Sequence, residues 1–486
     1  MSEQFDVVVI GGGTAGLVTA SGCARLGRKV ALIDKAKLGG DCLWTGCVPT
    51  KALVASAKLA HQMRNASAFG LESHDPKISP RAVMESMRAA RHAIEHHDTP
   101  EKFRALGIDV IEGNARFKSN DTVAVNNREL VAKDIVIATG SRTSVPPIDG
   151  LNEAGFIDHA SFLDRDDFPR SLLILGGGYI GIEFAQIFRR FGVDVTVAEM
   201  FDDCIIKEDH DVIARVRDIL TREGIVIRTG VAVNAVRVDD GRKIARLGAP
   251  ALAGQRISAE AASSFDEIAT DEIFVASGRR GNIEDLGLEV AGVKTNRSFV
   301  VVNEFLQTSA PRIWACGDVH GGLQFTHVAA FEAVKLVRNI LFPGRSRVRY
   351  DDIPWALFTD PEVGHIGMTE REARAKFGDS VRTYKVEMND VDRAVVDRTT
   401  QGFVKFVCDA KGKILGAHAL SSNASTLIEE IVLARKKGMK IGEVAQLVSA
   451  YPSLADSVQK TASLYYQDLQ TSWVGRLGRR IAAWSQ

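Results

Sequence analysis

The hydrophobic positions at the start of the chain form a short unbroken run rather than an alternating one. Residues 7–10 are all apolar and β-branched, which is typical of a strand buried on both faces in a parallel sheet. A glycine turn follows, then a helical stretch over residues 17–26, then a β-prone run over residues 29–34 that ends in an acid. The pattern predicts a strand–turn–helix–strand unit whose turn and acid are Gly11, Gly13, Gly16 and Asp34.

The same pattern recurs in the middle of the chain. An apolar run over residues 171–175 leads into a second glycine turn, which is followed by a helical stretch over residues 182–191 and a β-prone run over 194–198. The spacing between the first glycine and the acid is the same in both copies. The turn and acid of this second unit are Gly176, Gly178, Gly181 and Glu199.

Both units have the physical features of a dinucleotide site. The first glycine allows a tight turn, the second lets the backbone approach a pyrophosphate, and the third packs helix on strand. The helix N-terminus supplies partial positive charge, and the acid accepts hydrogen bonds from ribose hydroxyls. Two unrelated glycine loops are the alternative, but each copy here has its strand, helix and acid. The sequence therefore predicts two bound dinucleotides.

The second acid bears on the choice of cofactor. Glu199 would repel a 2′-phosphate, and it is followed by Met200 and Phe201 with no adjacent arginine. We therefore expect NADH, with NADPH less favoured. The alternative is that Glu199 is only a solvated strand end.

Two of the six cysteines lie close together, at Cys42 and Cys47. Pro49 and the helical stretch over residues 50–63 follow, and a thiol at a helix N-terminus has a lowered pKa. A zinc site would need further Cys or His ligands nearby, and a structural disulfide is unusual in a cytosolic protein. We interpret the pair as redox-active, and we predict no bound metal.

Composition limits the remaining possibilities. The 61 basic and 61 acidic side chains balance, which argues against a nucleic-acid-binding surface. With 45% hydrophobic and 25% charged residues the 486-residue chain is an ordinary globular mixture, and its length suggests about two to four domains. No signal peptide is recognisable and no apolar stretch approaches the ~18 residues of a membrane helix. We expect a cytoplasmic protein without stable membrane insertion.

Three motifs together resemble one family. They are the cysteine segment over residues 39–51, Ala-Thr-Gly at 138–140 after a predicted strand, and Trp-Ala-Cys-Gly-Asp at 314–318. The chain resembles the flavin-dependent pyridine nucleotide-disulfide oxidoreductases, which include dihydrolipoamide dehydrogenase, glutathione reductase and mercuric reductase. The resemblance implies an α/β fold, with two Rossmann-like domains for FAD and NAD and a C-terminal α+β dimerisation domain.

The resemblance also implies the domain order and a homodimer. The expected segments are FAD-binding residues 1–150, NAD-binding residues 151–279, an FAD-binding return segment 280–346, dimerisation residues 347–470 and a tail 471–486. The tail combines Arg476, Arg479 and Arg480 with Trp473, Leu477, Ile481 and Trp484, so a dimer extension, a frayed end or an amphipathic contact are all open.

Site roles follow from the resemblance, residue by residue. It implies FAD contacts from Gly11, Gly13, Gly16, Asp34, Lys51, Thr139, Gly140, Gly317 and Asp318. It implies NAD contacts from Gly176, Gly178, Tyr179, Gly181, Glu199 and Gly278, with Tyr179 resembling an aromatic gate. Cys47 becomes the thiol nearer the flavin, Cys42 the interchange thiol, and Lys51 a partner of Glu183. Electrons would pass from NADH through FAD and the cysteine pair to an acceptor.

The C-terminal region departs from the family pattern. Thiol-reducing members carry a histidine base followed by a glutamate, but here Tyr451 and Asp456 occupy these positions. Tyrosine is a poor base at neutral pH, and Ser453 with Asp456 also fits a capping box, as does Thr426 with Glu429. Mercuric reductases share the missing histidine but carry a C-terminal cysteine pair, whereas the last cysteine here is Cys408.

The acceptor therefore stays open at this point. We expect a small molecule, such as a metal ion, a quinone or a small disulfide, or a lipoyl protein. The alternatives are a true dihydrolipoamide dehydrogenase and a redox-sensing flavoprotein with little turnover. His92, His96 and His97 lie in a polar stretch, 91–101, that predicts a solvated helix face rather than a metal site.

Overall fold

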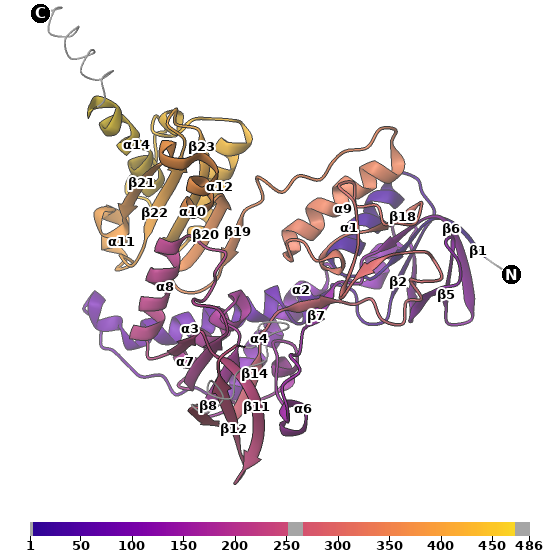
Figure 1. Ribbon diagram of the computed structural model, residues 1–486, viewed down its shortest axis with the longest axis horizontal. Helices are drawn as coiled ribbons and strands as arrows, with labels where there is room; N and C mark the ends of the chain where they lie inside the picture. The colour runs from indigo at the N-terminus through magenta and orange to yellow at the C-terminus, as the bar shows by residue number, and fades with distance from the viewer. Residues whose placement is uncertain (1–2, 251–265, 472–486) are drawn as a thin grey trace, which may run out of the picture.

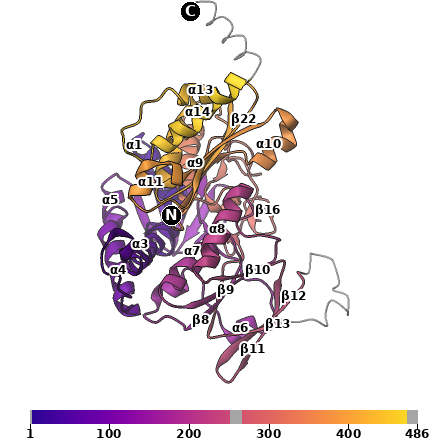
Figure 2. The ribbon, with the colours of Figure 1, turned by 90° about the vertical axis from the view of Figure 1, so that its left-hand side faces the viewer.

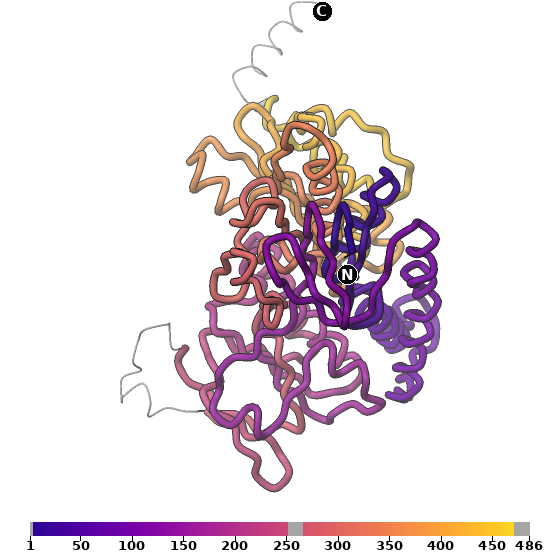
Figure 3. The backbone as a smooth tube through the Cα atoms, turned by 90° about the vertical axis from the view of Figure 1, so that its right-hand side faces the viewer, coloured from indigo at the N-terminus to yellow at the C-terminus, as the bar shows by residue number. Residues whose placement is uncertain are grey.

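A computed structural model describes residues 3–250 and 266–471, so the predicted tail at 471–486 lies outside the described residues except for Thr471. Figure 1 shows three units, each built around its own β-sheet. Figure 3 views the molecule from the side of the N-terminal unit, with the yellow C-terminal segment at the top and the magenta middle segment at the bottom.

The N-terminal sheet explains the unbroken apolar run at the start of the chain. Val8 and Ile10 pack into one hydrophobic core, whereas Val7 and Val9 pack into another on the opposite face. The strands run in the order β3 (Asp109–Glu112), β2 (Val30–Asp34), β1 (Glu3–Ile10), β6 (Arg128–Ile137), β5 (Thr122–Val125), β4 (Ala115–Phe117), and β18 (Ile313–Ala315) also pairs with β6. Helices α1 (Thr14–Arg25) and α9 (Thr326–Leu341) pack on each other beside this sheet (Figure 1).

The middle unit repeats the parallel arrangement. Its strands lie in the order β10 (Val226–Thr229), β9 (Asp194–Glu199), β8 (Ser171–Leu175), β14 (Glu272–Val275), with α7 (Tyr179–Arg190) and α8 (His210–Arg222). An antiparallel ribbon of β11 (Ala232–Asp239), β12 (Arg242–Gly248) and β13 (Asp266–Thr270) covers its other side. The strands predicted around the second glycine turn are thus present within a residue of their expected bounds.

The C-terminal unit is an antiparallel sheet covered by helices. Its order is β19 (Trp355–Leu357), β20 (Glu362–Gly367), β23 (Ile414–Ser421), β22 (Phe403–Cys408), β21 (Arg382–Glu387). Its helices are α10 (Glu370–Phe377), α11 (Asp392–Val396), α12 (Ala424–Lys436), α13 (Ile441–Val444) and α14 (Asp456–Thr471). Figure 2 shows α8 of the middle unit lying directly beneath this sheet.

Helices from the N-terminal unit connect the three units. Helix α3 (Cys47–Arg64) packs against α7 of the middle unit and against α4 (Pro80–Glu95). Lys58 on α3 reaches Asp360 of the C-terminal unit at 3.1 Å, and Arg190 on α7 reaches the same carboxylate at 2.9 Å. The shorter elements are α2 (Gly40–Trp44), α5 (Pro100–Arg104), α6 (Leu151–Ala154), β7 (Ser141–Thr143), β15 (Arg279–Gly281), β16 (Thr295–Asn296), β17 (Phe299–Val300), and the 3-10 turns Ala66–Phe69, Ser161–Asp164, Asp318–His320, Gly378–Ser380 and Met388–Asp390.

Three helices begin earlier than the sequence pattern predicted. Helices α1 and α7 start within their glycine turns, at Thr14 and Tyr179, and α3 starts at Cys47 rather than at residue 50. A proline is compatible with the first helical turn because its missing N–H would have no partner there. Pro49 can therefore follow the helix start, and Cys47 becomes the first helical residue.

Both predicted capping boxes are wrong. Helix α12 starts at Ala424 after Asn423, without a side-chain cap, so Thr426 and Glu429 lie inside the helix. Helix α14 starts at Asp456, the Ser453 hydroxyl is buried without a partner, and Asp456 instead pairs with Lys460 at 3.0 Å. Packing of the C-terminal unit decides these starts, because a local pattern fixes a helix end only to within a residue or two.

The histidine-containing polar stretch is not one continuous helix face. Helix α4 ends at Glu95, so His96 and His97 follow its end, while His92 is on the helix and exposed. In the described part of the chain, no helix combines the length and the apolar character that a membrane span requires.

Candidate active site

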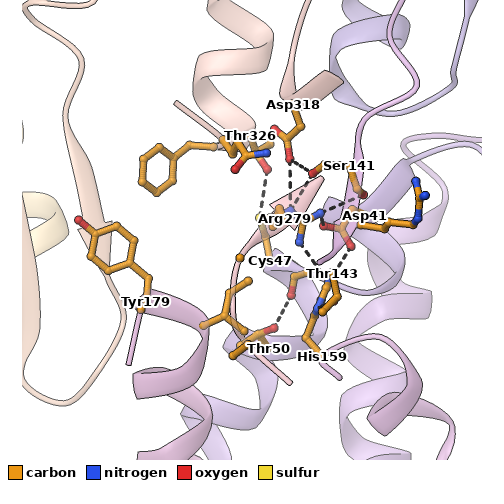
Figure 4. Close-up of a pocket in the computed structure, with 18 of the residues that line it drawn as sticks. Asp41, Cys47, Thr50, Ser141, Thr143, His159, Tyr179, Arg279, Asp318 and Thr326 are labelled. Atoms are coloured by element: carbon orange, nitrogen blue, oxygen red, sulfur yellow. Dashed lines mark hydrogen bonds and ion pairs between the residues drawn. The ribbon is translucent and has the colours of Figure 1, made fainter. Parts of the chain in front are cut away.

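A single cavity of about 1700 Å³ lies where the three units meet. It is larger than the roughly 300–1,000 Å³ of a usual small-molecule site, so it has room for more than one ligand. The cavity is lined by parts of both glycine turns, both cysteines of the close pair, and the N-terminal end of α9. Figure 4 shows its centre, where side chains from several elements converge.

The glycine turns of the two units have the same close contacts. A Cβ on Gly11 would lie 2.2 Å from the Ala138 carbonyl oxygen, and one on Gly176 would lie 2.5 Å from that of Ala276. Both glycines also have positive φ, at 111° and 109°. A Cβ on Gly16 or Gly181 would lie 2.0 Å or less from the carbonyl oxygen of the first glycine of its turn. Helix and strand therefore approach each other as the sequence pattern requires.

The acid at the end of each second strand is bonded to its own glycine turn. Glu199 accepts hydrogen bonds from the backbone N–H of Gly177 at 2.6 Å and of Phe201 at 2.9 Å. Asp34 accepts in the same way from the N–H of Gly12 and of Ala36. Each carboxylate keeps lone pairs for a ribose hydroxyl, because an ionised carboxylate has about four acceptor sites. Burial raises the pKa of Asp34 above its ordinary value.

The two close cysteines lie on consecutive helices, Cys42 in α2 and Cys47 at the start of α3. Cys47 Sγ lies 3.1 Å from Thr326 Oγ1 at the start of α9, and the Cys42 thiol is close enough to stabilise a charge on Cys47. The hydrogen bond from Cys42 lowers the pKa of Cys47 to about 6 against the opposing effect of burial, with further help from Thr326 and Lys51. The same bond raises the pKa of Cys42. The pair therefore holds one thiolate and one thiol at neutral pH.

Lys51 and Glu183 form an ion pair that joins α3 to α7. Lys51 Nζ lies 2.9 Å from Glu183 Oε2, and the buried Glu183 accepts a second bond from the Phe358 N–H at 2.8 Å. The Lys51 ammonium also sits 4.6 Å from the centre of the Phe358 ring. Such pairing is what allows a carboxylate to be buried, since an unpaired one is strongly disfavoured. One turn from Cys47, this pair places a cation beside the thiolate.

A second charged cluster lies beside Cys42, and most of it was not predicted from the sequence. Arg279 donates to Asp41 Oδ2 at 2.6 Å and to Ser141 Oγ at 2.7 Å, and Ser141 donates to Asp318 at 2.7 Å (Figure 4). His159 Nε2 lies 3.3 Å from Asp41 Oδ1. Burial opposes ionisation of Asp41, but the His159 hydrogen bond and the Arg279 charge hold its pKa below the ordinary value.

Only two positions in this cluster carried a sequence signal. Asp318 was predicted, and Asp41 is part of the cysteine segment, while Arg279 directly follows the predicted Gly278. Ser141 and His159 carry no local pattern. The antiparallel pairing of β7 with β15, which are far apart in the sequence, is what places Ser141 against Arg279.

The other predicted site residues divide into two groups. Thr139, Gly140, Gly178, Gly278 and Gly317 all line the cavity, as does Tyr179, whose ring centre lies 6.1 Å from that of Phe325. Tyr451 and Asp456 do not line the cavity of this chain as far as the described residues show. Tyr451 is exposed and donates to Asp392 at 2.8 Å, a bond that raises its pKa and keeps the phenol protonated.

The residues present fit two dinucleotides. Gly140 and Gly278 have positive φ and open space where a Cβ would stand, as expected where a backbone is approached by a ligand. The Gln324 side-chain nitrogen, which lines the cavity, is buried without a hydrogen-bond partner. Two glycine turns, an unpaired buried donor and a large cavity together suit two bound dinucleotides.

Comparison with known sequences decides the family. Residues 5–333 match the profile described as pyridine nucleotide-disulphide oxidoreductase, and residues 353–462 match the dimerisation domain of that family. The chain belongs to the pyridine nucleotide-disulphide oxidoreductases. The predicted fold class, two dinucleotide-binding units with a dimerisation domain, is thereby confirmed.

The relatives of this chain include three kinds of enzyme. The chain is 31% identical to a mercuric reductase of Streptomyces lividans, covering 96% of this chain and 97% of that protein. It is 32% identical to a dihydrolipoyl dehydrogenase of Bacillus subtilis, covering 95% of this chain and 98% of that one. A solved structure of the Escherichia coli flavoprotein disulfide reductase RclA, described as HOCl-induced and as a Cu(II) complex, is 28% identical with a TM-score of 0.83, covering 96% of this chain and all of that one.

The family and the geometry agree on the activity class. The protein is a flavoprotein disulfide oxidoreductase that uses FAD and a nicotinamide nucleotide, and its dimerisation domain supports a homodimer. The predicted enzyme class is confirmed, and Cys42 and Cys47 lie close together as predicted.

Proposed function

We propose that this protein is an NADH-dependent reductase that passes electrons through FAD and the Cys42–Cys47 pair to a small-molecule acceptor. The observation that carries the proposal is the placement of both cysteines in the same cavity as both glycine turns. FAD bound to the first turn would supply the two-electron chemistry that joins a hydride donor to a disulfide. We assign FAD to segments 1–150 and 280–346, NADH to 151–279 and dimerisation to 347–470.

The roles of the chain's own residues follow from their surroundings. One NADH supplies a hydride, whose two electrons and one proton convert the Cys42–Cys47 disulfide into one thiol and one thiolate. Cys47, with the lowered pKa, is the thiol that stays ionised beside Lys51, and Cys42, which keeps its proton, is the thiol that attacks the acceptor once deprotonated. The acceptor gains the two electrons and the disulfide is restored.

The preference for NADH rests on the end of β9. Glu199 is buried, bonded to the glycine turn, and followed by Met200 and Phe201, so a 2′-phosphate would meet a negative charge without a neighbouring arginine. The Glu199 charge therefore predicts that catalysis with NADPH is much less efficient than catalysis with NADH.

The nature of the acceptor rests on Tyr451. Exchange with a dithiol substrate needs a base that titrates near neutral pH, and a phenol whose pKa is raised by Asp392 does not meet that need. We therefore propose a metal ion, a quinone or a small disulfide rather than dihydrolipoamide as the main substrate. Oxidation of protein-bound dihydrolipoamide is the second candidate, because dihydrolipoyl dehydrogenases match nearly the full chain.

The deciding experiment is a steady-state acceptor screen with NADH and NADPH side by side. Metal ions, quinones, small disulfides and lipoamide are each supplied to the FAD-loaded enzyme, and dihydrolipoamide with NAD⁺ is assayed in reverse. We expect NADH to be preferred, lipoamide to be slow, and Cys42→Ser to lose turnover of thiol-dependent acceptors. Fast dihydrolipoamide turnover by the wild-type enzyme would support the second candidate instead.

The redox role of the cysteines has its own test. Anaerobic titration with NADH should produce a long-wavelength absorbance band from the Cys47 thiolate beside the flavin. Cys47→Ser should abolish the band and Cys42→Ser should leave a thiolate at Cys47. A protein that is reduced by NADH but turns over no acceptor would indicate a sensing role.

A further inference from the structure

A buried glutamate outside the predicted site receives hydrogen bonds from two units. Glu208 lies in the loop before α8, and its side chain is fully buried. Its Oε1 accepts from the Tyr179 hydroxyl at 2.6 Å and from Trp355 Nε1 at 2.6 Å, while its Oε2 faces His365 Nδ1 at 2.9 Å. Tyr179 belongs to the glycine turn of the middle unit, whereas Trp355 and His365 belong to the C-terminal sheet.

His365 is itself held firmly by its surroundings. Its second ring nitrogen lies 2.9 Å from the Gly367 carbonyl oxygen, so both ring nitrogens face oxygen atoms. The ring stacks on Trp355 with centres 3.7 Å apart, and the two residues are directly paired across β19 and β20. Trp355 in turn stacks on Phe325, which precedes the Thr326 that contacts Cys47.

The stacked pair of Trp355 and His365 begins a row of side chains that crosses the whole C-terminal sheet. Strand register places one residue from each strand side by side, in the order Trp355, His365, His418, Lys405, Lys385. The acidic start of α8 lies against this row, with Lys405 Nζ 2.8 Å from Asp209 and 3.0 Å from Asp211. Figures 1 and 2 both place α8 between the C-terminal sheet and α7.

The same side chains are of the types that bind metal ions. Glu208, His365 and His418 have ligand atoms within 4.8 Å of one another, and His418 Nδ1 is buried without a partner. The two Glu208 oxygens, however, already accept from three donors, and His365 uses both nitrogens. A metal ion would have to displace these bonds, so the cluster is organised as a hydrogen-bond network.

We infer that Glu208 is a positioning residue that anchors the Tyr179 hydroxyl and, through His365 and Trp355, ties the nicotinamide half of the cavity to the C-terminal sheet. Tyr179 is the first residue of α7, and it lines the cavity (Figure 4). A ring fixed at its hydroxyl is already ordered when a nicotinamide ring packs beside it. Binding then loses less side-chain entropy than it would with a free ring.

This inference rests on the proposed use of NADH. The Tyr179 hydroxyl donates its hydrogen bond to a buried carboxylate. The net free-energy contribution of one intramolecular hydrogen bond corresponds to a factor of roughly 3 to 10 in an equilibrium constant. Loss of the bond should therefore raise the KM for NADH and the Kd for NAD⁺ by about 3- to 10-fold. The KM for the acceptor should stay within about twofold, because the proposed function has the acceptor react at Cys42 and not at the anchored ring.

The experiment compares Glu208→Ala, Glu208→Gln, Tyr179→Phe and the double variant Tyr179→Phe/Glu208→Ala in the FAD-loaded enzyme. Steady-state KM values are measured for NADH and for the acceptor, and NAD⁺ binding is measured by calorimetry. Glu208→Ala and Tyr179→Phe should raise the KM for NADH to a similar extent. The double variant should show the KM of Glu208→Ala rather than the product of the two increases, because Glu208→Ala already removes the bond that Tyr179→Phe removes.

Glu208→Gln is the conservative variant. Its amide oxygen still accepts from Tyr179 and Trp355, and its NH₂ donates to a neutral His365, so its KM for NADH should be close to wild type. Tyr384→Phe is the matched control, because it removes a tyrosine hydroxyl bonded to Asp468 at 3.1 Å from the far strand of the same sheet. It should leave both KM values unchanged.

Several outcomes would overturn the inference. Multiplying effects in the double variant, an equal rise in the KM for acceptor and NADH, or a Tyr179→Phe enzyme with wild-type NADH binding would each do so. The comparison of Tyr179→Phe with wild type does not use the Glu208→Ala protein, so the inference can still be tested if Glu208→Ala does not fold. Wild-type protein that neither oxidises NADH nor binds NAD⁺ would refute the proposed function itself.

Discussion

Replacing Thr326 by valine tests how the reactive thiolate is stabilised. The Thr326 hydroxyl lies 3.1 Å from Cys47 Sγ and reaches it from the start of α9, far away in the sequence. Valine has nearly the same shape as threonine but cannot donate a hydrogen bond. The substitution therefore removes one donor to the thiolate and leaves the Cys42 thiol and Lys51 in place.

The magnitude follows from the value of a hydrogen bond to a charged group. Such a bond contributes about 1.5–3 kcal/mol, and one pKa unit corresponds to about 1.4 kcal/mol. The pKa of Cys47, held at about 6 by its neighbours, should therefore rise by about one to two units, to about 7–8. Because the thiolate form is present above the pKa, the variant should lose its thiolate at neutral pH and not only in acid.

The assay is a pH titration of the long-wavelength absorbance band of the dithiol enzyme. Wild-type protein should lose the band as the pH falls through about 6, and Thr326→Val should lose it at the higher midpoint. Thr50→Val is the matched control, since the Thr50 hydroxyl lines the same cavity but donates to the Gly46 carbonyl oxygen at 2.6 Å. An unchanged midpoint in Thr326→Val, or an equal shift in Thr50→Val, would refute the reasoning.

Further predictions concern the cofactor, the acceptor and the buried charges. Glu199→Ala should lower the NADH-to-NADPH ratio of kcat/KM by about tenfold, measured in paired assays, because the charge that repels a 2′-phosphate is gone. Tyr451→His should raise turnover of dihydrolipoamide with NAD⁺, and no increase would count against the assigned weakness of the phenol as a base. Lys405→Met should reduce the unfolding free energy by about 3–5 kcal/mol in denaturant titrations, because three carboxylates around a buried lysine lose their cation. Burial opposes ionisation of Asp209, but the charge of His418 and the hydrogen bond of Lys405 lower its pKa to about 2. Because the folded-state pKa is lower than the ordinary value of 3.8, ionised Asp209 stabilises the fold above about pH 4. The free energy of unfolding should therefore fall as the pH is lowered from about 4 to 2, and Asp209→Asn should make this fall smaller.

Features that depend on neighbouring residues were predicted well. The glycine turns, their strands and their acids follow from spacing alone, because turn geometry and strand burial act over a few residues. The pairing of Lys51 with Glu183 came from resemblance to the family, since 132 residues separate the two and no local pattern connects them. The capping boxes at Thr426 and Ser453 failed for the opposite reason, because an apparent local pattern gave way to packing of the C-terminal unit.

The sequence by itself determined the two nucleotide-binding units, the redox cysteine segment and the family, because each is encoded in short segments with strict steric demands. Only the tertiary structure decided which distant side chains surround those segments. Thr326 contacts Cys47, and Arg279 donates a hydrogen bond to Asp41. Glu208 is hydrogen-bonded to Tyr179 and to His365. Each of these contacts joins residues that are more than twenty positions apart in the sequence. Burial makes these contacts strong by removing water from charged groups, and burial is a property of the assembled units, which no single stretch of the chain contains.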